Sequence, residues 1–180
     1  MSGVMLMTVI QPAGRPGTMG GMDIRRALPA DLPTVFGIYA REAREGHATF
    51  DHEPRPMELW EDKLAADDHF LVAEHEGAVV GYATSSPFRP KPAYRHTRET
   101  TVYVAPGQQG RGVGRALYDD LLTRLVGDGV HLVVAAVALP NPGSLALHRA
   151  CGFEEVGVMR EVGRKHDRWI DVVFLQKVLG

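Results

Sequence analysis

Residues 99–125 of the chain read ETTVYVAPGQQGRGVGRALYDDLLTRL, and this stretch predicts a strand, a glycine-rich turn and a helix. Residues 100–104 are β-branched or aromatic, which favours an extended strand. Pro106 ends the strand because proline has no N–H to give to a sheet. Apolar residues then recur at helical spacing from Val113 to Leu125, with charged residues on the other side.

The turn between these two elements predicts a binding site for an anion. The first N–H groups of a helix have no partner inside the helix and lie at the positive end of its dipole. Glycines allow a diphosphate to approach the backbone, and Arg111 and Arg115 add positive charge. Two common phosphate loops are excluded, because these glycines show neither Gly-Lys-Ser/Thr nor the Gly-x-Gly-x-x-Gly spacing. The pattern that remains is Gln109-x-x-Gly112-x-Gly114.

Placed after a strand and at the start of a helix, this pattern resembles the acetyl-CoA loop of the GNAT N-acetyltransferases. A downstream segment with Asn141, Ser144 and Gly152-Phe153 is similar to the family's Asn-x-x-Ser and Gly-Phe motifs. Three other stretches resemble the phosphinothricin and methionine sulfoximine acetyltransferase branch: residues 94–104, 48–50 and 165–171. The resemblance covers residues 24–179. It implies an α/β fold with a central, mostly antiparallel, twisted sheet flanked by helices, and acetyl-CoA bound where the strands carrying Val104 and Val134 splay apart.

Length and composition bound the other possibilities. The chain has 180 residues, enough for one domain with a core, which we expect over residues 23–180. We expect residues 1–22 to be a disordered extension, or to precede a true start at Met19 or Met22.

The net charge of −2 argues against a nucleic-acid partner, and no apolar run approaches the ~20 residues that span a membrane. Cys151 is the single cysteine, so no internal disulfide forms, which fits the reducing cytoplasm. We expect the Cys151 side chain to be a small buried hydrophobic group.

The pattern of apolar, glycine and proline residues predicts the remaining elements. We expect helices from about residue 29 to 45, near residues 57–64, and from 145 to 151, where Asn141 or Ser144 provides the cap. Trp60 is expected in the core. A hairpin turn is predicted at Glu76-Gly77. The expected strands are residues 23–27, 69–74, 78–85, 99–104, 131–138, 154–162 and 168–178.

N-acetylation needs a base for the ammonium group, a hydrogen bond to the oxyanion and a proton for the departing thiolate. Glu99 is the candidate base, directly or through a water, because the family places a glutamate here; the alternative is a surface carboxylate at a sheet edge. A backbone N–H near Val104 is expected to hold the oxyanion. His148 occupies a position where many GNAT enzymes carry a tyrosine, in agreement with the phosphinothricin branch. It either gives a proton to the thiolate, shares in base catalysis or packs beside the pantetheine.

The resemblance assigns acetyl-CoA to the strand, the turn and the segment around residues 141–144. The backbone of residues 102–104 pairs with the pantetheine like an added strand. Asn141 either bonds a pantetheine amide, caps a helix, or does both. The expected cofactor residues are Val102, Tyr103, Val104, Gln109, Gly110, Arg111, Gly112, Val113, Gly114, Arg115, Asn141 and Ser144.

The acceptor site is expected on the same strand and on two loops. Arg89 and Lys91, in the loop at residues 87–92, form either a cationic site for a carboxylate or a solvated surface. Arginine suits a carboxylate because its planar group donates two parallel hydrogen bonds. Phe50 is either a wall of the amine pocket or core. The resemblance implies that the hairpin with His166, Asp167 and Trp169 selects the substrate near a dimer interface; the alternative is a plain turn with a half-buried tryptophan. The expected substrate residues are Phe50, Arg89, Lys91, Glu99, Thr100 and Thr101.

The sequence therefore predicts a cytoplasmic, homodimeric enzyme that transfers acetyl from acetyl-CoA to the α-amine of a small amino-acid analogue. Direct attack in a ternary complex is expected, because no well-placed nucleophile indicates an acetyl-enzyme. The histidines and acids show no metal-binding spacing, so no metal is expected. Two alternatives stay open: acetylation of a protein or peptide, and a non-catalytic acyl-CoA-binding module.

Overall fold

The computed structural model describes residues 21–66 and 68–180, whose seven strands form one sheet in the order β1-β2-β3-β4-β5-β7-β6. All neighbouring strands are antiparallel except β4 and β5, so the predicted mostly antiparallel sheet is confirmed. The strands are β1 (Met22–Arg26), β2 (Phe70–His75), β3 (Ala78–Pro87), β4 (Thr97–Val104), β5 (Leu132–Ala138), β6 (Glu154–Lys165) and β7 (Arg168–Val178).

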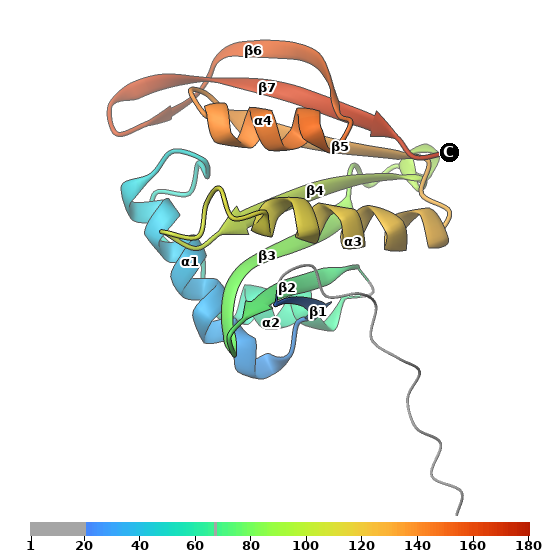
Figure 1. The fold of residues 1–180 in the computed structure, drawn as a ribbon. Helices are drawn as coiled ribbons and strands as arrows, with labels where there is room; N and C mark the ends of the chain where they lie inside the picture. Colours follow the sequence, from blue (N-terminus) through green and yellow to red (C-terminus); the bar gives the residue numbers. More distant parts are fainter. Residues whose placement is uncertain (1–20, 67) are drawn as a thin grey trace, which may run out of the picture.

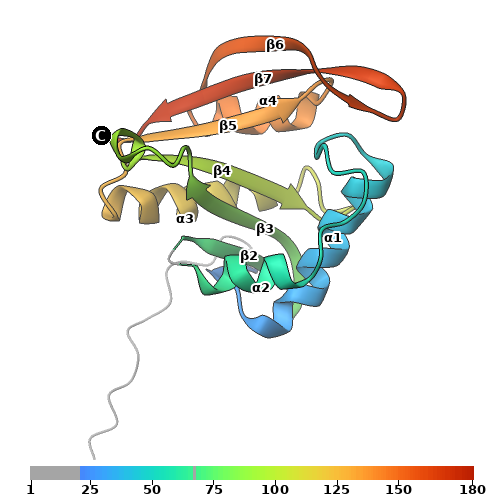
Figure 2. The same ribbon diagram turned by 180° about the vertical axis from the view of Figure 1, so that it is seen from behind.

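Helices cover both faces of this sheet. Helices α3 (Val113–Gly127) and α4 (Pro142–Ala150) lie on one face, and α1 (Leu32–Glu45) and α2 (Glu58–Ala65) lie on the other (Figures 1 and 2). Short 3-10 turns precede α1 at Pro29–Asp31 and β4 at Pro92–Tyr94. Most of the proposed extension, residues 1–20, lies outside the described residues, whereas Met22 already belongs to β1.

Each face of the sheet has its own hydrophobic core. On the α3 side, the leucines at helical spacing are fully buried against the strands, as the sequence predicted. On the other side, Trp60 of α2 is 8% exposed and packs against Tyr39, Phe70 and Tyr82. Because each large apolar side chain contributes about 1.5–3 kcal/mol on burial, these cores fix the helices on the sheet. The prediction of Trp60 as a core residue is confirmed.

Three turns show how the local sequence sets the ends of elements. Glu76 and Gly77 form the predicted hairpin turn, with φ of 50° and 78°. Helix α4 begins at Pro142, earlier than the predicted Leu145, because the Asn141 Oδ1 accepts a hydrogen bond from the Ser144 N–H at 3.1 Å. Asn141 is therefore the cap, and the alternative with Ser144 as cap was wrong. Strand β6 runs three residues beyond its predicted end, to Lys165, because the turn needs only His166 and Asp167, whereas β7 has the predicted bounds.

The parallel pair β4 and β5 opens into a V. The two strands pair only between residues 97–99 and 132–134. Beyond this point, and among the described strands, β4 pairs only with β3 and β5 only with β7, so the predicted splay is confirmed. Side chains alternate along β4, with Thr100, Val102 and Val104 toward α3, and Tyr103 toward α1 and α2. The same alternation places Glu99 and Thr101 on the α1 side.

Candidate active site

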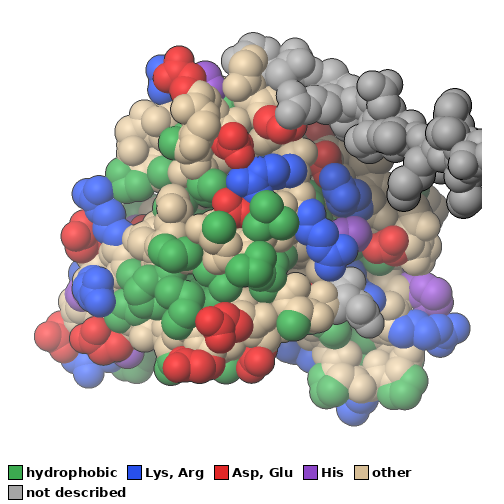
Figure 3. Space-filling view, turned by 90° about the horizontal axis from the view of Figure 1, so that it is seen from below, with side chains coloured by type: hydrophobic (Ala, Val, Ile, Leu, Met, Phe, Trp, Pro, Cys, Tyr) green, Lys and Arg blue, Asp and Glu red, His purple; other side chains and the backbone are tan. Residues whose placement is uncertain are grey.

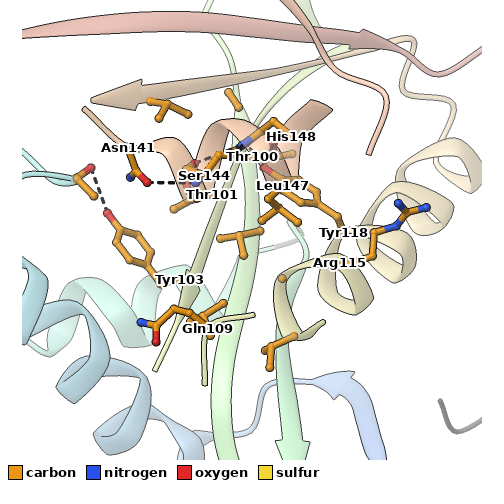
Figure 4. A pocket seen from close by; sticks show the side chains of 18 of the residues that line it. Thr100, Thr101, Tyr103, Gln109, Arg115, Tyr118, Asn141, Ser144, Leu147 and His148 are labelled. Carbon is orange, nitrogen blue, oxygen red and sulfur yellow. Dashed lines mark hydrogen bonds between the residues drawn. The ribbon is translucent and has the colours of Figure 1, made fainter. Parts of the chain in front are cut away.

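A cavity of about 560 Å³ occupies the V between β4 and β5 (Figure 4). Its floor and walls come from both strands, from the glycine turn with the start of α3, from the start of α4, and from the end of α1 with the following loop. The lining residues are Glu42, Ala48, Thr100–Val104, Gln108–Gly110, Gly112–Arg115, Tyr118, Ala135–Ala138, Asn141, Gly143, Ser144, Leu147 and His148.

Backbone N–H groups of the glycine turn and of α3 line one end of the cavity. Gly110 and Gly112 have φ of 76° and 82°, a left-handed conformation that favours glycine. Helix α3 has no side-chain cap, so its first N–H groups are available to a ligand. Gly114 lets α3 approach α4, because a Cβ there would lie 2.7 Å from a methyl group of Leu147. This end of the cavity therefore suits a diphosphate.

The polar side chains of the turn hold its shape. The Gln109 Oε1 accepts a hydrogen bond from the Gly107 N–H at 2.9 Å, which closes the turn on itself. The Arg115 guanidinium bonds the Asp119 carboxylate at 2.8 Å and the Ala150 carbonyl at 2.7 Å, which ties α3 to α4. Arg111 bonds Gln108 at 2.9 Å and lies outside the cavity lining. The two arginines thus flank the site, while backbone groups form its surface.

A chain of hydrogen bonds joins β4, α3 and α4 at the closed end of the V. The Tyr118 hydroxyl lies 2.7 Å from His148 Nε2 and 3.4 Å from the Thr100 hydroxyl (Figure 4). On the other side of the ring, His148 Nδ1 donates to the Ser144 carbonyl at 2.7 Å. Tyr118 is fully buried and His148 is 5% exposed. Burial lowers the pKa of His148 and raises the pKa of Tyr118, so both groups are neutral at pH 7.

Glu99 lies at the closed end of the same V, on the α1 side of the sheet. It is the last residue of β4 that pairs with β5, opposite Val134. Lys63 of α2 is its cationic neighbour: burial lowers the pKa of Lys63, while the charges of Asp68 and Glu99 oppose this. Glu99 does not itself line the cavity, and reaching a ligand there requires a bridging water or a small movement.

The loop after α1 closes the cavity on the α1 side. The Tyr103 hydroxyl is 3.5 Å from the Ala48 carbonyl, and the Glu42 carboxylate accepts a hydrogen bond from the Ala48 N–H at 2.7 Å. A Cβ at Gly46 would lie 1.8 Å from the Glu42 carboxylate, so a larger residue there would displace this carboxylate from its bond to the Ala48 N–H. His47 Nε2 donates to the Pro140 carbonyl at 2.9 Å, which ties this loop to the end of β5.

The β6–β7 hairpin holds the same loop from its other side. Lys165 is 1% exposed, and its ammonium group donates to the carbonyls of Thr49 at 2.8 Å and Glu42 at 3.4 Å. Burial lowers the pKa of Lys165. His166 Nε2 donates to the Gly46 carbonyl at 3.0 Å. Residues 46–50 are therefore fixed between β5 and the hairpin, and they restrict the α1 side of the cavity.

Two other features of the described residues carry no comparable chemistry. A hollow of about 700 Å³ between β1, α1 and α2 is lined by apolar side chains, and hydrophobic groups gather on this lower face (Figure 3). Its charged residues, Arg26 and Glu61, do not form a converging polar set. Over residues 21–66 and 68–180, no group of three or more His, Cys, Asp or Glu is arranged to hold a metal ion. No helix in the same ranges is long and apolar enough to cross a membrane.

Residues 33–153 match the acetyltransferase (GNAT) family. The chain belongs to the GNAT acetyltransferase family. It is 40% identical over 171 residues to a phosphinothricin N-acetyltransferase from Streptomyces coelicolor, covering 91% of this chain and 99% of the relative. It is 36% identical over 158 residues to an L-methionine sulfoximine/L-methionine sulfone acetyltransferase from Pseudomonas aeruginosa, covering 85% and 92%.

Two solved structures share the fold of this acetyltransferase. A phosphinothricin acetyltransferase from Sinorhizobium meliloti, in complex with acetyl-CoA, superposes with a TM-score of 0.84 at 36% identity and 89% coverage of each chain. A ribosomal-protein-alanine N-acetyltransferase from Brucella melitensis gives 0.82 at 40% identity, covering 86% of this chain and 98% of that one. The chain is thus an acetyl-CoA-dependent N-acetyltransferase.

The cavity of the acetyltransferase fits acetyl-CoA. The edges of β4 and β5 that face the V have no ladder partner within the described residues, so a pantetheine arm can bond to them like a strand. The free N–H groups of α3 suit the diphosphate. When bound, acetyl-CoA supplies an activated acetyl group with a thiolate leaving group. Burial raises the pKa of the Cys151 thiol, which is 4% exposed, in keeping with a packed side chain.

The structure gathers most of the predicted site residues. All the expected cofactor residues except Arg111 line the cavity, together with Thr100, Thr101 and His148. Phe50, Arg89 and Lys91 lie outside the lining: Phe50 packs over Gly163 of β6, the Arg89 guanidinium stacks on Phe88 at 4.6 Å, and Lys91 is exposed. Trp169, expected to be half-buried if the hairpin is a plain turn, is 61% exposed.

Three residues of the site were not found from the sequence. Tyr118 lies four residues after Gly114 in α3, so helical spacing places it on the same face as the turn. Glu42 follows Ile38 by four residues and Val35 by seven, so it lies on the apolar face of α1. A glutamate on such a face indicates a specific polar contact, and this signal could have identified Glu42. Lys165, at the end of β6, had no local signal, because its carbonyl partners lie more than 110 residues away.

Proposed function

We propose that this acetyltransferase moves acetyl from acetyl-CoA to the α-amine of a small amino-acid analogue of the phosphinothricin or methionine sulfoximine kind. The substrates named for its relatives, and the motifs shared with that branch, support this assignment. The lining of the cavity supports a separate place for each substrate: we assign the diphosphate to the turn and the start of α3, and the amine to the side next to α1.

The closed acceptor end is the observation that carries the small-substrate proposal. Residues 46–50 are held by Lys165, His166 and the Pro140 carbonyl, so a folded polypeptide has no open groove on this side. Arg89 and Lys91 are exposed near the start of β4 and are free to receive a substrate carboxylate. Phe50, on the loop itself, is placed to contact the acceptor side chain.

We assign the chemistry to the closed end of the V. Glu99 takes the proton of the ammonium group, through a water, from the α1 side of β4. A backbone N–H of β4 just beyond Glu99 stabilises the oxyanion, and the amine attacks the thioester directly in the ternary complex. The donor expected near Val104 lies five residues farther along β4, about 16 Å from Glu99 at ~3.3 Å per residue, which is too far to act at the same carbon. His148 lies on the α3 side of the V, where we place the departing sulfur.

We also propose that the enzyme works as a cytoplasmic homodimer through the exposed β6–β7 hairpin. Strand β6 is a sheet edge, and its apolar side chains are exposed. Exposed apolar groups along an unpaired edge favour association with another surface. The exposed apolar side chains of this hairpin lie on both of its faces, because consecutive strand residues alternate, and they are Val156, Val158, Met159, Val162 and Trp169. Analytical ultracentrifugation should give a dimer that Val158→Glu weakens; a monomer at micromolar concentration contradicts the proposal.

The second candidate function is acetylation of a protein N-terminus. The likeness to the ribosomal-protein-alanine N-acetyltransferase favours it. It requires residues 46–50 to release the hairpin so that a peptide can enter. A non-catalytic acyl-CoA-binding role is the third candidate, and it requires no turnover with any amine.

The experiment that separates these functions is release of CoA by the purified protein across a panel of amines. The panel contains phosphinothricin, methionine sulfoximine, methionine sulfone, common amino acids, a polyamine and peptides with free N-termini. We expect turnover with the phosphinic and sulfoximine compounds. Turnover confined to peptides contradicts the substrate proposal, and silence across the panel with retained acetyl-CoA binding favours the non-catalytic role.

A further inference from the structure

The hydroxyl of Tyr118 occupies a particular place in the fold of the acetyltransferase. It lies 3.4 Å from Thr100, the first residue of β4 beyond the pairing with β5. The Thr100 hydroxyl in turn lies 3.4 Å from the carbonyl of Val134, the last paired residue of β5. The Tyr118 hydroxyl is therefore at the apex of the V, on the face opposite to Glu99, and the tyrosine lines the cavity.

The hydrogen bonds around His148 determine which group donates and which accepts in the series Tyr118, His148, Ser144. A carbonyl can only accept, so the proton of neutral His148 lies on Nδ1, which donates to the Ser144 carbonyl at 2.7 Å. His148 Nε2 then carries a lone pair and accepts the Tyr118 O–H at 2.7 Å. In this arrangement His148 has no proton to give into the cavity. It can only receive one, and it receives it through Tyr118.

We propose that Tyr118 is a catalytic residue of the acetyl transfer and that Tyr118 and His148 together carry a proton from the attacking nitrogen to the departing sulfur. The proposal rests on the acetyltransferase activity but not on which amine is the acceptor. It also selects among the three roles considered for His148: the histidine stores the proton, and the tyrosine hands it over.

The two steps conserve protons overall. After attack, the nitrogen of the tetrahedral intermediate carries one proton too many. That proton passes to the Tyr118 oxygen while the Tyr118 proton passes to His148 Nε2, which leaves a neutral tyrosine and an imidazolium. When the carbon–sulfur bond breaks, the imidazolium returns its proton to the Tyr118 oxygen, and the tyrosine proton passes to the thiolate. Tyr118 and His148 end as they began.

The surroundings suit a group that holds a charge only briefly. The buried thiol of Cys151, which directly follows α4, is close enough for its charge to raise the pKa of Tyr118, and Phe153 packs against both rings. Within residues 21–66 and 68–180, no carboxylate bonds His148, whose partners there are Tyr118 and Ser144. An imidazolium there is poorly stabilised, so it returns its proton readily.

The proposal is tested by kinetics of Tyr118→Phe, with Tyr82→Phe as the matched control. Both changes remove one hydroxyl from a buried tyrosine, but Tyr82 packs in the core on the α1 side. We expect kcat of Tyr118→Phe to fall about 10²-fold, with KM for acetyl-CoA within about two-fold of the wild type, and Tyr82→Phe to keep wild-type kcat. His148→Gln should lose a similar factor, and the double variant should be no slower than the worse single variant, because both act in one chain.

A second readout does not depend on activity. Nitrogen-15 spectra of the histidine rings, with His148→Gln for assignment, should place the proton of neutral His148 on Nδ1 in the free protein. A proton on Nε2 overturns the proposal, as does wild-type kcat in Tyr118→Phe or multiplicative losses in the double variant. If wild-type protein acetylates no amine, the acetyl-transfer assignment itself fails. The ring spectra still show whether Tyr118 donates its hydrogen bond to His148 Nε2.

Discussion

Gly81→Ala tests the close packing of β3 against the cofactor strand. A Cβ at Gly81 would lie 2.9 Å from the Tyr103 carbonyl oxygen and 3.0 Å from a Val113 methyl group. Favourable carbon–oxygen contacts are about 3.3–3.6 Å, so β4 or the start of α3 must move by about 0.5 Å. Such overpacking costs about 1–3 kcal/mol, and the reduced freedom of alanine in the unfolded chain offsets about 0.4–1 kcal/mol of this. We therefore expect a net loss of about 1–2 kcal/mol.

The assay is thermal unfolding of Gly81→Ala beside Gly37→Ala. Gly37 is exposed inside α1, and a Cβ there meets nothing within 4 Å, so the same change should stabilise the protein by about 0.4–1 kcal/mol. For a chain of this size, Tm should fall by about 2–8 °C in Gly81→Ala and rise by about 1–4 °C in Gly37→Ala. Because Tyr103 lines the cavity, KM for acetyl-CoA should rise in Gly81→Ala alone. Equal Tm values for the two variants would refute the packing argument.

Three further predictions concern single side chains. Glu99→Gln should fold and bind acetyl-CoA by calorimetry but lose about 10²–10⁴-fold in kcat at pH 7, and unchanged turnover removes Glu99 as the base. Arg89→Ala should raise KM for a carboxylate-bearing amine about ten-fold, whereas Arg41→Ala, also exposed, should not; an unchanged KM excludes Arg89 as the carboxylate site. Asp31→Asn should destabilise the protein by about 1–3 kcal/mol at pH 7, because Arg25 holds Asp31 in two hydrogen bonds at 2.7 and 2.8 Å. The hydrogen bonds from Arg25 lower the pKa of Asp31, so this stabilisation is complete above the unfolded pKa of about 3.9 and is lost as pH falls through the lower folded pKa. The urea midpoints of wild type and variant should therefore converge in acid, and a constant gap contradicts the assignment.

Much of the fold and of the cofactor site could be predicted because their signals are local. The strand, turn and helix of residues 99–125 are set by β-branched residues, glycines and apolar spacing, and the structure places them as expected. Asn141 was recognised because capping depends on a residue three positions away. The start of α4 was placed too late, because Pro142 was not taken as a first helical residue, although proline suits that position.

The acceptor side could not be predicted in the same way, because long-range contacts build it. Tyr118 meets His148 only after α3 packs on α4, and Lys165 meets Thr49 only after the hairpin folds over the loop. Long-range contacts also determine which of the two arginines, Arg111 or Arg115, lines the cavity. Arg115 lines the cavity while its guanidinium is held by the Ala150 carbonyl, which belongs to another helix, whereas Arg111 bonds a neighbour in the turn.

The central claim is direct acetyl transfer from acetyl-CoA to a small α-amine in the V between β4 and β5. The most direct test is a single turnover of protein loaded with acetyl-CoA and mixed with L-methionine sulfoximine, followed by mass spectrometry of protein and small molecules. We predict that N-acetyl methionine sulfoximine and CoA form in equal amounts while the mass of the protein stays constant. Acetylated protein that decays as product forms, or release of CoA without an acetylated amine, would contradict the claim.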